Sequence, residues 1–112
     1  MTTSEIKRLY LLDGTYFGFL QNGNVFSRDG IYLGWLDGQV VWGQNGEYRG
    51  KLTTNGNVSY IVKKSFVLDP IPRAPKAPMA VPTLPAPAAN VAPVVPEIGV
   101  IDGFSLENGQ VI

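Results

Sequence analysis

The chain has 112 residues, which is enough for one small domain with an appendage. Nine Lys and Arg balance nine Asp and Glu, and the zero formal charge argues against a strongly basic surface for nucleic acid or acidic lipid. His and Cys are both absent, which excludes Cys/His zinc sites, His-ligated haem, Cys nucleophiles, Ser-His-Asp triads and disulfides.

The first fourteen residues, MTTSEIKRLYLLDG, place an acid and two bases before a very short apolar run. A secretory signal needs roughly 7–15 consecutive apolar residues. A membrane-spanning helix needs about 20, and prolines interrupt the longest apolar region, residues 79–95. The sequence therefore predicts a cytoplasmic protein that binds no membrane.

An eight-residue pattern then occurs three times at a spacing of 16 residues. The copies are DGTYFGFL from Asp13, DGIYLGWL from Asp29 and NGEYRGKL from Asn45. Asp-Gly or Asn-Gly between apolar runs indicates a β-hairpin, because both central residues of a type I′ turn need positive φ. Each copy is therefore predicted to be a strand, a tight turn and a returning strand. An aromatic residue precedes each turn on the same period: Tyr10, Phe26 and Trp42.

A second set of turns links the copies at Asn22-Gly23, Asp37-Gly38 and Asn55-Gly56. Together the turns predict an all-β domain over residues 6–68, a meander of about eight strands. Its fourth hairpin, Val58 to Phe66, is degenerate, because Lys63-Lys64 stands where Asp-Gly is expected.

Two-residue turns would place Leu11 opposite Tyr16 and Leu9 opposite Gly18, and so on in each copy. One face of the hairpins then carries the repeated residues and is predicted to be the structural core: Tyr16, Tyr32, Tyr48, Leu20, Leu36 and Leu52. The other face is predicted to be an interaction face, comprising Phe17, Phe19, Leu33, Trp35, Trp42 and Arg49.

This interaction face is expected to meet solvent, because Arg is rarely buried, and to bind a partner through its apolar residues. The alternative is burial under the chain's own tail or under a sister chain. Arg49 is expected to stack on Trp42.

All nine prolines lie between Pro70 and Pro96. Residues 69–96 also contain seven alanines, so they are predicted to form an extended, semi-rigid polyproline II linker of about 3.1 Å per residue. Residues 97–112 again mix apolar residues with turn signals. LENGQV from Leu106 matches LQNGNV from Leu20 at four of six positions, which predicts strand structure here, on this module or on a neighbour.

The repeated segments LYLLDGTYFGFL, VFSRDGIYLGWL and VVWGQNGEYRGKL, with the weaker NVSYIVKKSF, resemble the bacterial 4-fold beta flower family. The resemblance covers residues 6–68 and extends loosely to the proline-rich tail. It implies four β-hairpin petals around a pseudo-four-fold axis and no assigned activity. A weaker likeness links the repeats to choline- and glucan-binding cell-wall repeats, which also use periodic aromatics.

The sequence offers no catalytic, cofactor-binding or metal-binding residues. General acid–base catalysis most often uses His or paired carboxylates, and the repeated Asp13, Asp29 and Asn45 are interpreted as turn residues. A non-enzymatic interaction or assembly module is therefore predicted, with the tail docking on the aromatic face in cis or in trans. Its partner would be a protein or peptide, including a second copy in a homo-oligomer. The alternative is a module that binds a glycan or small ligand through the repeated aromatics.

Overall fold

The computed structural model describes residues 6–56, 58–78, 84–86, 88–95, 98–108 and 110–112. These residues contain β-strands and no helix, which confirms the predicted all-β fold. The strands are β1 (Ile6–Tyr10), β2 (Tyr16–Gln21), β3 (Asn24–Ser27), β4 (Tyr32–Asp37), β5 (Val40–Gly43), β6 (Tyr48–Asn55), β7 (Val58–Lys64), β8 (Val100–Asp102), β9 (Leu106–Glu107) and β10 (Gln110–Val111).

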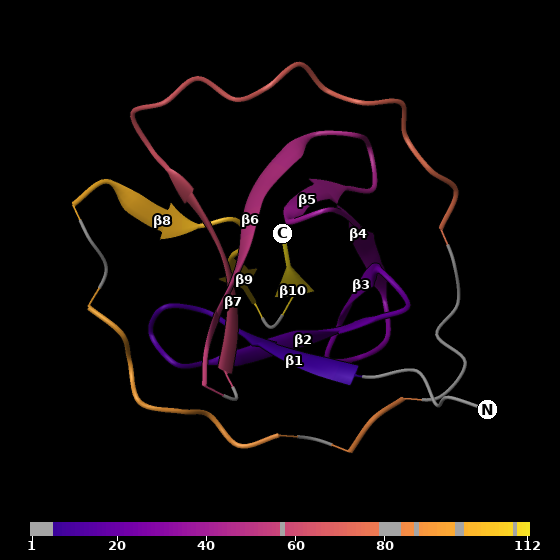
Figure 1. The fold of residues 1–112 in the computed structure, drawn as a ribbon. Coiled ribbons are helices and arrows are strands. Elements are labelled where there is room, and N and C mark those ends of the chain that lie inside the picture. The colour runs from indigo at the N-terminus through magenta and orange to yellow at the C-terminus, as the bar shows by residue number, and fades with distance from the viewer. Residues whose placement is uncertain (1–5, 57, 79–83, 87, 96–97, 109) are drawn as a thin grey trace.

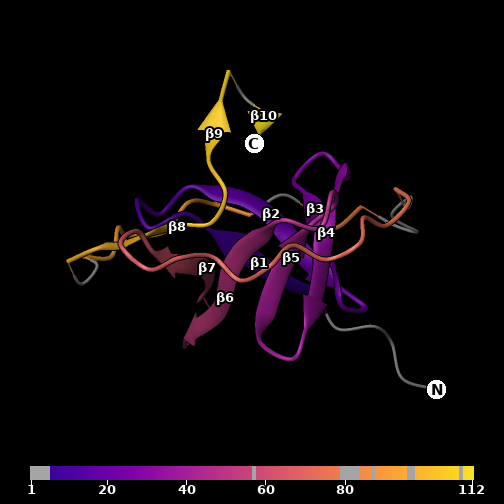
Figure 2. The ribbon, with the colours of Figure 1, turned by 90° about the horizontal axis from the view of Figure 1, so that it is seen from above.

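Strands β1 to β8 form one sheet in chain order, and the sheet closes on itself because β1 also pairs in parallel with β7. Four antiparallel strand pairs follow one another around the resulting ring (Figure 1). We call them petals one to four: β1–β2, β3–β4, β5–β6 and β7–β8. This arrangement is the predicted four-fold array. The short hairpin of β9 and β10 stands over one end of the ring (Figure 2).

The turn within each of the first three petals is a three-residue loop and not the predicted type I′ turn. In petal one the Leu11 N–H donates to the Thr15 carbonyl, and the Gly14 N–H donates to the Leu11 carbonyl, both at 2.9 Å. Gly14 has a φ of +93°, whereas Asp13 has no positive φ. This is a type I turn followed by a left-handed glycine bulge. The predicted type I′ geometry occurs instead in the connecting turn at Asn22-Gly23, with φ of 53° and 75°.

The extra loop residue changes which side chains share a face. The predicted pairing of Leu9 with Gly18 is confirmed, but a bulge after Leu9 then places Tyr10 opposite Tyr16. The same shift occurs in petals two and three. Phe17 consequently packs with the interior leucines, and Tyr16 lies on the other side of the sheet. The prediction of one core face that combines the tyrosines and leucines is therefore wrong.

The core fills the inside of the ring. Leu9, Val25, Val41 and Ile61 are at most 2% exposed, and they lie on the first strand of each of the four petals. Each such side chain contributes about 1.5–3 kcal/mol by burial. Leu20 is buried with them, and Leu36 and Leu52 pack against them half-buried.

The fourth petal differs from the prediction. Strand β7 runs unbroken through Lys64, so the expected hairpin with a turn at Lys63-Lys64 is wrong. Its partner is β8, from far along the chain, and Lys63 lies opposite Ile101.

The proline-rich segment lies between β7 and β8. We call its residues 69–95 the belt. The described parts of the belt form no strand, and they run around the outside of the ring (Figures 1 and 2). The belt therefore passes the outer faces of the petals before the chain returns to pair with β7.

Candidate functional site

We call the place where two neighbouring petals meet a junction. Three of the four junctions hold a triad of aromatic side chains. In each triad the middle residue is the cross-strand partner of both others. Ring centroids lie 5.4–5.9 Å apart, at separations typical of favourable aromatic contacts, in the pairs Tyr10–Tyr16, Phe19–Phe26, Phe26–Tyr32 and Trp42–Tyr48. The triads are Tyr60–Tyr10–Tyr16, Phe19–Phe26–Tyr32 and Trp35–Trp42–Tyr48.

Only half of the residues of the predicted interaction face lie in these triads. Phe19, Trp35 and Trp42 belong to triads. Phe17 and Leu33 lie on the core side of the sheet, and Arg49 lies against Phe104 in the C-terminal segment. Phe17, Phe19, Trp35 and Trp42 are at most 5% exposed, so the prediction of one continuous face in solvent is wrong. The structure instead buries these aromatics within the chain itself.

The C-terminal segment covers the core beside Arg49. Phe104 is 3% exposed, and its ring centroid lies 5.8 Å from that of Phe17. The Arg49 guanidinium sits 4.7 Å over the Phe104 ring, and its Nη1 donates to the Gly103 carbonyl at 3.2 Å. Arg49 therefore stacks on Phe104, which corrects the prediction that it stacks on Trp42.

A belt residue occupies the place over Trp42. The Arg73 guanidinium lies 4.6 Å from the centre of the Trp42 ring and also pairs with the Asp37 carboxylate. The Lys76 ammonium lies 4.6 Å over Trp35. Two belt cations thus lie on one aromatic triad, and such contacts strengthen as the groups lose water.

The belt also makes main-chain hydrogen bonds to the turns of petals three and one. Arg73 and Lys76 donate their N–H groups to the carbonyls of Gly46 and Gln44, at 2.8 and 3.0 Å. At the equivalent carbonyls of petal one, Gly14 and Leu12 accept from Val91 and Val94, both at 2.8 Å.

The donors in each belt site are three residues apart, which matches the three residues per turn of polyproline II. Both sites have the same pattern, because Arg73-Ala-Pro-Lys76 corresponds to Val91-Ala-Pro-Val94. The composition of this segment predicted a uniform linker and gave no indication of the two contact sites. The repeated Ala-Pro step between donors was the available signal.

The glycines in the turns of petals one and three allow the belt to approach those turns closely. A Cβ at Gly46 would overlap the Arg73 carbonyl, and one at Gly14 would overlap the Val91 carbonyl. These glycines therefore serve both the positive φ of the turn and the contact with the belt.

Two polar side chains hold the returning chain against petal one. The Asn90 amide oxygen accepts the Tyr16 N–H, and a carboxylate oxygen of Asp102 accepts the Leu12 N–H, both at 2.9 Å. Burial raises the pKa of Asp102, and the Leu12 hydrogen bond offsets part of that rise. Burial also raises the pKa of the Tyr16 hydroxyl.

Within the described residues, no three His, Cys, Asp or Glu side chains gather as a metal site would require. The same residues include no helix long and apolar enough to cross a membrane.

Comparison with known proteins gives the family. The model of the 4-fold beta flower proteins matches residues 2–99, which is most of the chain. The chain therefore belongs to this family, as the resemblance implied. No curated protein and no solved structure matches it.

Proposed function

We propose that this 4-fold beta flower protein is a non-enzymatic assembly module whose petal ring receives an extended proline-rich segment ending in a short strand. The observation that carries the proposal is the pairing of β8 with β7, which completes petal four with a strand from a distant part of the chain. Added strands bind through main-chain hydrogen bonds and through pockets for alternate side chains. The edge of β7 that receives β8 fits the same strand of a second copy equally well.

The ends of the belt support exchange between two chains. Leu68 and Ile71, where the chain leaves the ring, and Val95 and Ile98, where it returns, are 88–96% exposed. A segment with few contacts at both ends can swing to a neighbouring ring without loss of core packing. Domain swapping of this kind retains every contact of the closed form. The partner in this proposal is a second copy of the chain.

The alternative of a glycan-binding module depends on accessible aromatic platforms. Tyr48 is half-buried, and Phe66 is the only described aromatic residue with an exposed side chain. The repeated aromatics lie in triads and support the alternative less than they support assembly.

Cysteine cross-linking between β7 and β8 tests the proposal, because the natural chain has no Cys. Lys63 and Ile101 are cross-strand neighbours, at a spacing that a disulfide can bridge. We would mix the single variants Lys63→Cys and Ile101→Cys, one carrying a size tag, and then unfold, refold and oxidise them together. A covalent heterodimer forms only when one chain donates β8 to the other.

Assembly predicts a heterodimer whose yield rises with protein concentration. A mixture of Lys7→Cys and Ile101→Cys is the matched control, because β1 and β8 are not paired, and it should give only background cross-linking. The double variant Lys63→Cys/Ile101→Cys reports the closed form as an internal disulfide. An internal disulfide without heterodimer at any concentration would show that β8 only closes its own chain, and would overturn the assembly role.

A further inference from the structure

The fourth junction of the ring has no aromatic triad. The middle position, which holds Tyr10, Phe26 or Trp42 in the other petals, is Val62 in petal four. Its two cross-strand partners are Lys51 and Asp102. Small and charged residues therefore stand where the other three junctions are filled with rings.

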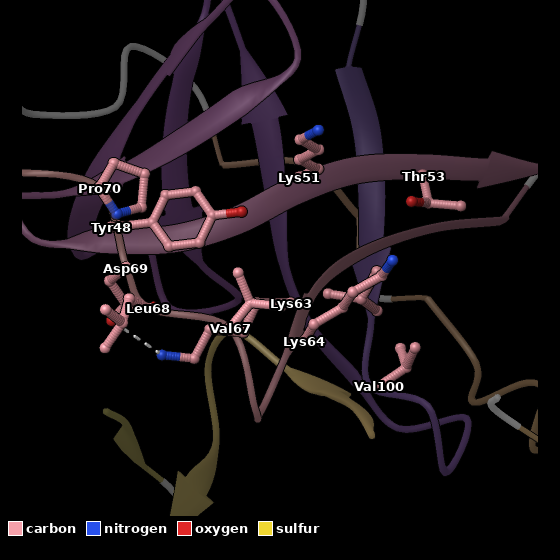
Figure 3. Close-up of a pocket in the computed structure, with 11 residues that line it drawn as sticks. Tyr48, Lys51, Thr53, Lys63, Lys64, Val67, Leu68, Asp69, Pro70 and Val100 are labelled. Carbon is pink, nitrogen blue, oxygen red and sulfur yellow. Dashed lines mark ion pairs between the residues drawn. The ribbon is translucent and has the colours of Figure 1, made fainter. Parts of the chain in front are cut away.

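A groove occupies the space beside this position. Its volume is about 430 Å³, and it lies between β6, β7, the start of the belt and β8 (Figure 3). The register places Lys51, Val62 and Lys64 on one face of the sheet, because Lys51 is opposite Val62 and side chains alternate along β7. The apolar part of the wall comprises Tyr48, Val62, Val67, Leu68, Pro70 and Val100.

The charged part of the wall has three lysines and one aspartate. Lys63 is paired with Asp69 at 3.5 Å, whereas Lys51 and Lys64 have no carboxylate within 4 Å among the described residues. In Figure 3 the Tyr48 hydroxyl, the Thr53 hydroxyl and the Lys64 ammonium face the same open space. Burial and the charge of Asp69 raise the pKa of Tyr48 above its ordinary value.

We propose that this groove binds a small apolar monoanion, a short hydrocarbon chain or ring that carries one carboxylate. The hydrocarbon lies against Val62, Val67 and Pro70, and the carboxylate pairs with Lys64 and Lys51 and accepts from the hydroxyl groups. Apolar walls with a few convergent polar groups are typical of small-ligand sites, and charge-assisted hydrogen bonds fix the orientation of the anion. The groove exists in the closed single chain, so the inference does not depend on strand exchange.

The test is a titration of the full chain, followed by two-dimensional ¹H–¹⁵N NMR. Octanoate is the probe, 1-octanol is its uncharged match, and acetate supplies the charge without the chain. We expect octanoate to give saturable shifts at Tyr48, Lys51, Val62 and Lys64. We expect octanol and acetate to bind at least about tenfold more weakly, since each lacks one of the two contacts.

Two variants locate the site. Val62→Trp places a ring where the other junctions have one and should abolish the saturable shifts, and Val62→Phe serves if the tryptophan variant does not fold. The double variant Lys51→Gln/Lys64→Gln should weaken octanoate binding about tenfold or more. Lys7→Gln, an exposed lysine on β1 away from the groove, should leave binding unchanged.

Three results would overturn the inference: no saturable octanoate shifts at the groove, octanol binding as tightly as octanoate, or unchanged binding in the Val62 variants. Each is separate from the cross-linking result, because strand exchange is measured without ligand.

Discussion

Petals one to three and petal four use the same sheet but differ in how they are built. In each of the first three, a glycine turn joins two neighbouring strands, and a triad of aromatics covers the junction. In petal four the second strand arrives after the whole belt, and Val62, Lys51 and Asp102 replace the aromatic rings. Petals one to three are therefore built from strands that are neighbours in the sequence, whereas petal four depends on a strand from the distant end of the chain.

This difference has a physical cause. A hairpin closes a short loop at small entropic cost, while β8 must close a loop that contains the belt. The belt offsets part of that cost, because polyproline II is already extended and loses little conformational freedom on docking. The belt contacts at petals one and three place the returning chain beside β7. Closure of the fourth petal and docking of the belt are therefore expected to be coupled.

The largest expected effect comes from Phe104→Ala, which tests whether the distant segment is part of the core. Phe104 is buried against Phe17 and beneath Arg49. Its removal should lower the free energy of unfolding by about 3–5 kcal/mol, as for other buried phenylalanines. Urea denaturation followed by circular dichroism measures the change.

Phe66→Ala is the control for this comparison, because Phe66 is exposed at the start of the segment that leaves β7, and its loss should cost far less. An equal loss of unfolding free energy in the two variants would show that the segment around Phe104 is not part of the core. Petal four would then be independent of that segment.

An intermediate effect is expected from Gly46→Ala compared with Gly38→Ala, which tests the belt contact on petal three. Both glycines have positive φ, +89° and +64°, so both variants carry backbone strain of roughly 1 kcal/mol. Only the Cβ at position 46 meets the belt, at the Arg73 carbonyl. Gly46→Ala should therefore cost about 1–3 kcal/mol more than Gly38→Ala in thermal or urea unfolding.

The same pair should differ in tryptophan emission, because displacement of Arg73 uncovers Trp42. Equal stability losses with unchanged emission would mean that the belt does not rest on petal three in solution.

The smallest effect is expected at Asp102, which occupies the position that a tyrosine holds in petals one to three. Burial raises its pKa in the folded state above the unfolded value of 3.8, so the folded protein binds this proton more tightly than the unfolded chain does. The contribution of Asp102 to stability is therefore most favourable below pH 3.8 and is lost as the pH rises through the folded pKa.

Asp102→Asn removes this charge and keeps an oxygen to accept the Leu12 N–H. The variant should unfold at a higher temperature than the natural chain at neutral pH, and the two should converge at about pH 3. A difference that stays constant from acid to neutral pH would assign the effect to packing and not to the buried charge.

The sequence predicted the features that local patterning controls. The 16-residue repeat predicted hairpins in series. The pairing of Leu9 with Gly18, expected from two-residue turns, holds because the bulge after Leu9 offsets the extra loop residue. Turn chemistry predicted positive φ at Gly14, Gly30 and Gly46, although the loop contains one more residue than expected. The choice between a two-residue and a three-residue loop depends on how the strands twist against their neighbours, and Asp-Gly is compatible with both.

That single residue decided which side chains near each turn share a face, because the bulge exchanges the sides of Tyr16 and Phe17 while Leu20 keeps its predicted side. Phe17 went to the core and Tyr16 to a triad, so the candidate site had to be assigned from the structure. The partner of β7 was also beyond local patterning, since Lys63-Lys64 contains no turn residue and nothing nearby could pair with it. The chain by itself determined a repeated all-β fold with a proline-rich extension; only tertiary packing decided where that extension lies, because its docking combines main-chain bonds to petals one and three with a strand added to petal four.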